Sequence, residues 1–186
     1  AESERDIGVI ISSNLKPAVH CSDIARKANF ALNQILKCFH YRDKHVFLNL
    51  YKQRVRPLPE FSTAAWNPWL KSDIELLEKV QMKAVKAISS LKAKTYPEKL
   101  KELKLMSLEA RRLHYDLIQV YKSLHKLDKV NPLTWFNTVG QNPARVTRLS
   151  NYELNLIKSR SRLDVRSQFF SQRVVDKWNS IPTDVK

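Results

Sequence analysis

The stretch KSDIELLEKVQMKAVKAI, residues 71–88, decides the fold class. Its apolar residues recur at intervals of three and four, which places them on one face of an α-helix. They are Ile74, Leu77, Val80, Ala84 and Ile88. Ser72 and Glu75 have the spacing of a capping box, the reciprocal pair that closes the first turn of a helix. The segment therefore predicts an amphipathic helix with one buried face.

The same periodicity predicts further helices on both sides of this segment. One follows Ser22, a second begins after Asp43 as its cap, and a short third has a capping box formed by Thr95 and Glu98. A long helix after Ser107 is expected to bury Leu113, Leu117, Val120, Tyr121 and Leu124. The 186 residues include two glycines, which disfavours turn-rich β-sandwiches, barrels and glycine-rich phosphate loops. We therefore predict a mainly α protein.

Strands are predicted in two places. The β-branched run DIGVIISS, residues 6–13, indicates one strand or half of a hairpin near the N-terminus. YELNLIK and SRLDVR, residues 152–158 and 161–166, alternate apolar with polar side chains and predict an antiparallel hairpin. A last helix is expected from about Phe169 to Ser180, with Trp178 on its buried face. Two prolines, a glycine and several asparagines before these segments indicate a linker at 131–151.

The charge balance indicates a polyanionic partner. The chain has 33 Lys and Arg against 18 Asp and Glu, a formal net charge of +15. A field of this sign favours nucleic acid first and an anionic membrane surface second. No apolar run approaches the roughly 18 residues of a membrane span, so we expect no membrane partner. Two cysteines are too few for a disulfide framework.

Four residues near one predicted helix are candidate zinc ligands: His20, Cys21, Cys38 and His40. A helix of about 16 residues between the cysteines would separate them by roughly 25 Å at the α-helical rise. Adjacent ligands such as His20 and Cys21 also do not match the usual zinc spacings. We therefore predict no metal.

Trp66 and Trp69 flank Pro68, and we expect them to pack in a bend between helices rather than to stack on bases.

Four strings of the sequence, in order, resemble one family. They are DKHVFLNLYKQRVRP (43–57), NPWLKSDIELLEKVQ (67–81), SLEARRLHYDLIQVYKSLHKLDKV (107–130) and RSRLDVRSQFFSQRVVDKWNSIP (160–182). They resemble the C-terminal part of a reverse transcriptase from a non-LTR retrotransposon of the jockey and chicken-repeat kind. Four strings in the order of the family are more specific than one short motif.

The resemblance implies a division of the chain. Residues 1–16 would end the palm as a primer-grip-like strand, and residues 17–130 would form a helical thumb-like domain. The linker at 131–151 would then lead to a hairpin–helix unit at 152–186. The expected fold is thus mainly α, a helical thumb-like bundle with a short N-terminal strand or hairpin and a small C-terminal β-hairpin plus helix.

The thumb of such polymerases closes on template and primer, so the resemblance implies binding of an RNA–DNA hybrid or duplex DNA. If the chain is a fragment, the parent polymerase domain is a further partner, and the compartment is the cytoplasm or nucleus. The Tyr-x-Asp-Asp string that holds the catalytic metals of the family does not occur here. We therefore predict no polymerase activity and no cofactor for this chain. The alternative is a retroelement-derived remnant repurposed as a helical protein- or ligand-binding scaffold.

Eight cations are the candidate nucleic-acid-binding residues: Lys52, Arg54, Arg56, Arg111, Arg112, Arg160, Arg162 and Arg166. The last three occupy even positions on an alternating segment, so a strand would project them from one face. Such a face is suited to track phosphates. The other interpretation is a solvated edge strand whose charges prevent aggregation.

Overall fold

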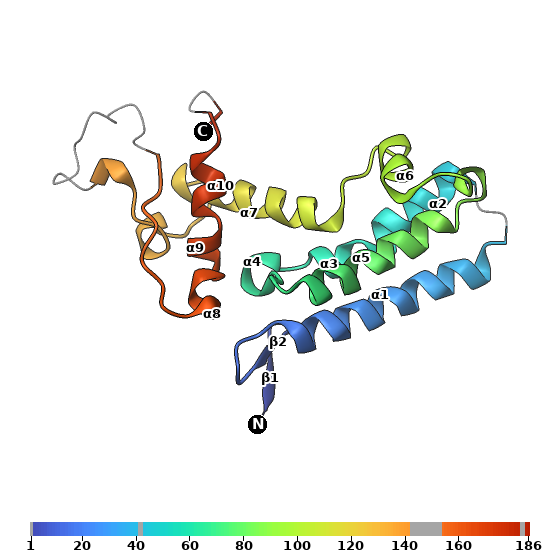
Figure 1. Cartoon of the computed structure of the whole chain (residues 1–186), viewed down its shortest axis with the longest axis horizontal. Coiled ribbons are helices and arrows are strands. Elements are labelled where there is room, and N and C mark those ends of the chain that lie inside the picture. The colour runs from blue at the N-terminus through green and yellow to red at the C-terminus, as the bar shows by residue number, and fades with distance from the viewer. Residues whose placement is uncertain (1, 41–42, 142–153, 183–184) are drawn as a thin grey trace. The chain divides into compact units, whose positions relative to one another are not determined.

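The structure is a computed structural model that describes residues 2–40, 43–141, 154–182 and 185–186. As predicted, the described chain is mainly helical, with a two-stranded antiparallel hairpin near the N-terminus (Figure 1). It divides into two compact units, Ala1–Arg112 and Leu113–Lys186. This division lies within the range predicted as one helical domain, 17–130.

The hairpin consists of β1 (Ser3–Asp6) and β2 (Val9–Ser12). Ile7 and Gly8 form the turn with φ values of 42° and 88°. Two-residue hairpin turns of this kind need positive φ, which glycine adopts at little cost. The strand predicted at 6–13 is therefore confirmed over β2, while its first residues belong to β1 and the turn.

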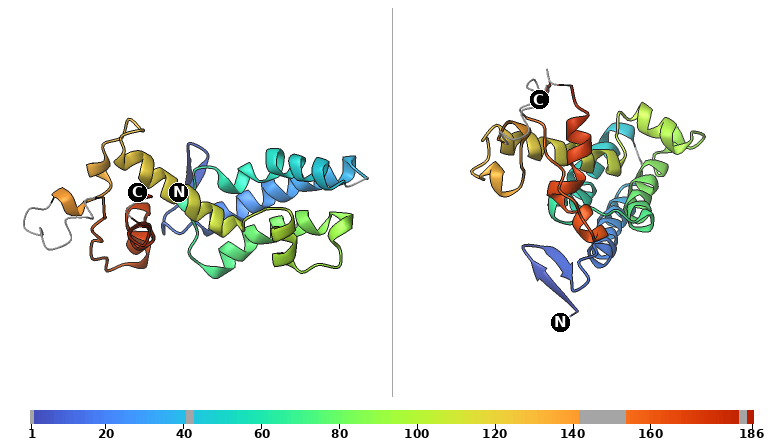
Figure 2. Two further views of the ribbon diagram at one scale, coloured as in Figure 1. Left: turned by 90° about the horizontal axis from the view of Figure 1, so that it is seen from above. Right: turned by 60° about the vertical axis from the view of Figure 1, so that its left-hand side comes forward.

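Among its described residues, the first unit contains eight helical elements between the hairpin and the start of α7. They are α1 (Ala18–Cys38), α2 (Lys44–Leu50), the π-helical η1 (Tyr51–Val55), α3 (Pro57–Glu60), α4 (Thr63–Trp66), α5 (Lys71–Lys86) and the 3-10 turn η2 (Ser89–Leu91), followed by α6 (Tyr96–Glu102). Helices α1 and α5 lie side by side (Figure 2). Leu32 of α1 and Leu77 of α5 are fully buried in the core of the unit.

Side-chain caps begin two of these helices, α2 and α6. The Asp43 carboxylate accepts hydrogen bonds from the backbone N–H groups of His45 and Val46, so its predicted role as a cap is confirmed. The capping box of Thr95 and Glu98 is also present. The predicted box at Ser72 is wrong, because α5 begins at Lys71, so that Ser72 lies inside the helix, and no side chain caps its start.

The helix that Asp43 begins does not stay a regular α-helix up to Pro57. The residues just before the proline, Tyr51–Val55, form a wider turn. The Arg56 N–H donates to the Tyr51 carbonyl at 2.9 Å, the spacing of a π-helical turn. Proline lacks an N–H and clashes with the carbonyl four residues before it, which an α-helix cannot accommodate without distortion. The π-helical η1 is the local response, and α3 follows directly.

Helix α7 (Leu108–Leu124) buries a different face from the one predicted. Its buried residues are Leu108, Arg112, Asp116, Val120 and Ser123, whereas Tyr121 is exposed. Of the predicted inner face, Val120 is buried and Leu113, Leu117 and Leu124 are half-buried. The face is displaced because two charged side chains of α7 find polar partners inside the protein, which apolar periodicity cannot indicate.

The second unit continues with short elements. They are η3 (Pro132–Thr134), η4 (Val139–Gln141), α8 (Asp164–Ser167), α9 (Phe170–Arg173) and α10 (Val175–Asn179). Residues 131–141, predicted as a linker, are packed here, since Phe136 is buried and Thr138 pairs with Leu156. The remainder of that predicted linker, 142–151, lies outside the described residues.

The predicted C-terminal hairpin is wrong in its described part. Leu156 forms an isolated antiparallel bridge with Thr138, and residues 164–166 of SRLDVR belong to the helix α8 (Asp164–Ser167). The last helix is present but broken, as α9 and α10 meet at Val174. Trp178 is 2% exposed, so its predicted burial is confirmed. Competing backbone pairing with Thr138 explains why period-two alternation did not produce the predicted strand pair.

Candidate nucleic-acid interface

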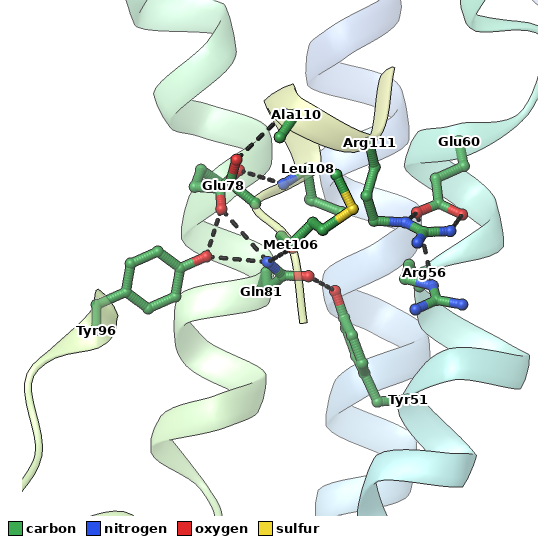
Figure 3. Close-up of polar contacts among 11 residues, drawn as sticks. Tyr51, Arg56, Glu60, Glu78, Gln81, Tyr96, Met106, Leu108, Ala110 and Arg111 are labelled. Atoms are coloured by element: carbon green, nitrogen blue, oxygen red, sulfur yellow. Dashed lines mark hydrogen bonds and ion pairs between the residues drawn. The ribbon is translucent and has the colours of Figure 1, made fainter. Parts of the chain in front are cut away.

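Two of the predicted cations of the first unit meet on one carboxylate. Arg111 at the start of α7 forms a bidentate pair with Glu60 of α3, and the Nε of Arg56 lies 3.5 Å from the same carboxylate (Figure 3). The side chains of Arg56 and Arg111 are each 18% exposed. Glu60 cancels one of their two charges, and bidentate geometry fixes the Arg111 guanidinium. The ion pairs of Glu60 with Arg56 and Arg111 therefore hold α3 and the start of α7 together, and they do not leave an open phosphate site.

Arg112 is buried even more completely, with 1% of its surface exposed. Its Nε donates to the Asn67 side-chain oxygen at 3.1 Å. A guanidinium in this position is not presented to a phosphate at the surface. Arg112 is therefore not a candidate phosphate contact in this structure.

A buried polar network attaches the chain before α7 to α5 and so positions Arg111 (Figure 3). Gln81 of α5 is fully buried. Its Oε1 accepts from Tyr51 Oη at 2.7 Å, and its Nε2 donates to the Met106 carbonyl at 3.0 Å. Glu78, one turn earlier, accepts from the Leu108 N–H at 3.0 Å and from the Tyr96 hydroxyl. Burial of a satisfied network of this kind specifies one packing of the helices.

Lys52 and Arg54 lie on the π-helical η1. Arg54 is exposed and Lys52 is half-buried. Neither side chain has an ion-pair partner within the part of the chain that the structure describes. Wide turns of this type are frequent at functional sites. Lys52 and Arg54 are thus two predicted cations of the first unit without an acidic partner among the described residues.

Arg160, Arg162 and Arg166 belong to the second unit and are exposed. They do not share the face of a strand, because Arg160 and Arg162 lie in irregular chain and Arg166 lies in α8. The Arg166 guanidinium carbon lies 5.3 Å from the centroid of the Phe169 ring. Across the described residues, none of the three forms an ion pair.

Trp135 and Phe169 line the same pocket as Arg166, although the sequence did not predict them as site residues. Phe169 stacks on Trp135, with ring centroids 6.0 Å apart and 13° between the planes. Both rings are partly exposed, 41% for Trp135 and 42% for Phe169. The pairs WF at 135–136 and FF at 169–170 were the available signal, but nothing in their spacing predicts that they meet.

Packing behind these rings holds them in place. Phe170 lies edge-on to both Trp135 and Phe136, at centroid distances of 6.3 and 5.6 Å. The backbone of residues 137 and 139 pairs with that of 155 and 157. The Asn179 side chain in turn donates to and accepts from the backbone of Leu156. Segments distant in the sequence therefore build one surface.

The candidate zinc ligands do not form a site. Helix α1 places Cys21 near its start and Cys38 at its end, and Cys21 is buried while Cys38 is exposed. No group of three or more potential metal ligands occurs among the described residues.

Trp66 is 4% exposed and its indole donates to the Phe61 carbonyl at 2.8 Å, which confirms packing for this tryptophan. Within the same described ranges, every helix is too short or too polar to span a membrane.

Comparison with known proteins adds one distant similarity. The chain is 22% identical over 125 residues to an uncharacterized protein of Caenorhabditis elegans, an alignment that covers 66% of this chain and 61% of that protein. The matched segment thus spans about three fifths of the length of this relative. No family model and no solved structure matches the chain.

Proposed function

We propose that this chain binds nucleic acid through phosphate contacts. The observation that carries the proposal is the exposure of Arg54, Arg160, Arg162 and Arg166 without an acidic partner among the described residues. Cations that the fold does not neutralise can replace the counterions of a polyanion, which is the main source of such affinity. The net charge of +15 supports the same conclusion.

We further propose that the chain is the thumb and post-thumb region of a non-LTR retrotransposon reverse transcriptase. The four strings between residues 43 and 182 support this assignment. The ligand would then be an RNA–DNA hybrid or duplex DNA, with catalysis in a polymerase domain outside this chain. Because the contacts are to phosphates, binding should tolerate any base sequence.

Titration of a labelled RNA–DNA hybrid at several salt concentrations tests the proposal. If about four to six phosphates are neutralised, log K should fall against log salt with a slope of roughly −4 to −5. Replacing Arg160, Arg162 and Arg166 together by glutamine should flatten the slope by up to about three. Replacing Lys52 and Arg54 should flatten it by up to about two.

A charge-matched control uses three exposed lysines of the first unit, Lys86, Lys92 and Lys101, replaced by glutamine. It removes as much charge as the triple arginine variant and should change the slope less. Equal flattening by both variants would reject the assigned contacts. Contacts between cations and phosphates are strongest at low salt. If the chain does not bind the hybrid at about 50 mM salt, nucleic-acid binding is therefore rejected and the repurposed scaffold is favoured.

A further inference from the structure

The second unit contains a solvent-open pocket, which we call the aromatic pocket. Its volume is about 240 Å³, and its lining includes Trp135, Asn137, Ser159, Arg166, Phe169 and Gln172. Pockets for drug-sized ligands begin at about 300 Å³. The aromatic pocket is therefore suited to one small planar ring system, with the rest of the ligand outside it.

The chemistry of the lining favours an aromatic ring attached to an anion. Arg166, Phe169 and Trp135 form a continuous series of a cation and two rings. The remaining exposed surface of Trp135 is a flat apolar area of the kind on which bases stack. Arg166 lines the pocket, and Arg160 and Arg162, which follow the lining residue Ser159 in the chain, are also exposed.

Two amide side chains add hydrogen-bonding capacity to the pocket. The Oε1 of Gln172 accepts from the Ser159 N–H at 3.1 Å, which fixes the orientation of the side chain. Within the described residues, the Nε2 of Gln172 has no hydrogen-bond partner, and neither does the side-chain amide of Asn137. These amide groups can form hydrogen bonds with the polar edge of a base. An apolar peptide side chain in the pocket would leave them without hydrogen-bond partners.

We propose that the aromatic pocket binds one unpaired base of single-stranded nucleic acid, stacked on Trp135, while the neighbouring arginines bind flanking phosphates. The proposal rests on the proposed function, because it presupposes nucleic-acid binding. It adds a second type of ligand: a base within a duplex has both faces covered by its neighbours, so only an unpaired base can enter. Stacking makes the site tolerant of base identity.

The test uses the full chain and two labelled single-stranded oligonucleotides of the same length, one of thymidine nucleotides and one of abasic sites. The unmodified chain should bind the thymidine probe about 5- to 150-fold more tightly, the range expected for one stacked base. Trp135→Ala should remove this preference, and Trp135→Phe should retain most of it. The salt slope should stay unchanged in both variants, because stacking releases no counterions.

Equal affinity of the unmodified chain for the two probes would overturn the proposal without any variant. So would a Trp135→Ala variant that keeps the preference while its circular dichroism is unchanged. Hybrid duplex binding separates the two proposals. If the chain binds the hybrid with the expected salt slope but binds the two single-stranded probes equally well, only the pocket proposal is rejected. If it binds neither the hybrid nor the single strands, both proposals are rejected.

Discussion

Arg173 binds Asp116 through two hydrogen bonds, Nε to Oδ2 and Nη2 to Oδ1, each 3.0 Å long. The Asp116 side chain is 2% exposed and that of Arg173 is 13% exposed. The same guanidinium lies 5.5 Å from the centroid of Phe170, the residue that packs behind Trp135. One buried ion pair thus connects α7 to the support of the aromatic pocket.

Replacing Asp116 by alanine should lower the free energy of unfolding by about 3–5 kcal/mol, because it leaves a buried guanidinium without its counter-charge. Replacing both partners, as Asp116→Leu with Arg173→Met, should recover much of this loss, since no uncompensated charge remains. Urea unfolding measures both. Asp164→Ala at an exposed site is the control, and an Asp116→Ala midpoint equal to that of the control would contradict the prediction.

Trp178→Ala should destabilise the protein by about 3–5 kcal/mol, the usual cost of truncating a large buried aromatic side chain. The indole is 2% exposed and its Nε1 donates to the Leu154 carbonyl at 2.9 Å. Trp178→Phe keeps most of the apolar volume but leaves that carbonyl without its donor, so a smaller loss of about 1–3 kcal/mol is expected. Thermal unfolding should rank the chains in this order, and equal melting temperatures would refute it.

The two cysteines should differ in reactivity in the folded protein. Burial, with a further contribution from Asp73 and opposed by Arg112, raises the pKa of the Cys21 thiol to about 12. Because the thiolate is the reactive form, Cys21 should not react with a disulfide reagent near neutral pH. Exposed Cys38 should react. We expect one reactive thiol per folded chain, two after denaturation, and none in folded Cys38→Ser. Fast reaction of two thiols per chain without denaturant would disprove the burial of Cys21.

His20 should make stability depend on pH. Its Nδ1 accepts from the Ile10 N–H at 3.1 Å, and burial lowers its pKa below 6.5, with Lys27 and Arg5 lowering it further and Asp23 opposing them. The unfolded chain therefore takes up a proton at a higher pH than the folded chain. The stabilisation is fully present above the unfolded pKa and is lost as pH falls from about 6.5 through the folded pKa.

Measurement of urea midpoints from about pH 7.5 to pH 5 tests this sign, because the range covers the unfolded pKa of histidine. His20→Gln should be less stable at the upper end and should show a flatter dependence on pH. His40→Gln, at an exposed site, should follow the unmodified chain. A slope that does not change in His20→Gln would assign the pH dependence to other groups.

The helices of the first unit follow from local features of the sequence. Leu77 and Val80 are buried where the three-and-four spacing of residues 71–88 places them, and Asp43 and Thr95 cap the helices that follow them. These features involve residues within one or two turns of each other. They can therefore be recognised in the sequence, and the mainly α class could be predicted from them.

The candidate site depended on contacts between distant segments. Asp116 and Arg112 are buried because Arg173 and Asn67 reach them from elsewhere in the chain. SRLDVR alternates like a strand, yet it pairs with no strand among the described residues and ends in α8. The aromatic pocket exists because Trp135 and Phe169, 34 positions apart, are brought together. Periodicity indicates which side chains prefer to be buried. It does not indicate which buried polar side chain finds a hydrogen-bond or ion-pair partner, because that partner is brought near only when the whole chain has packed.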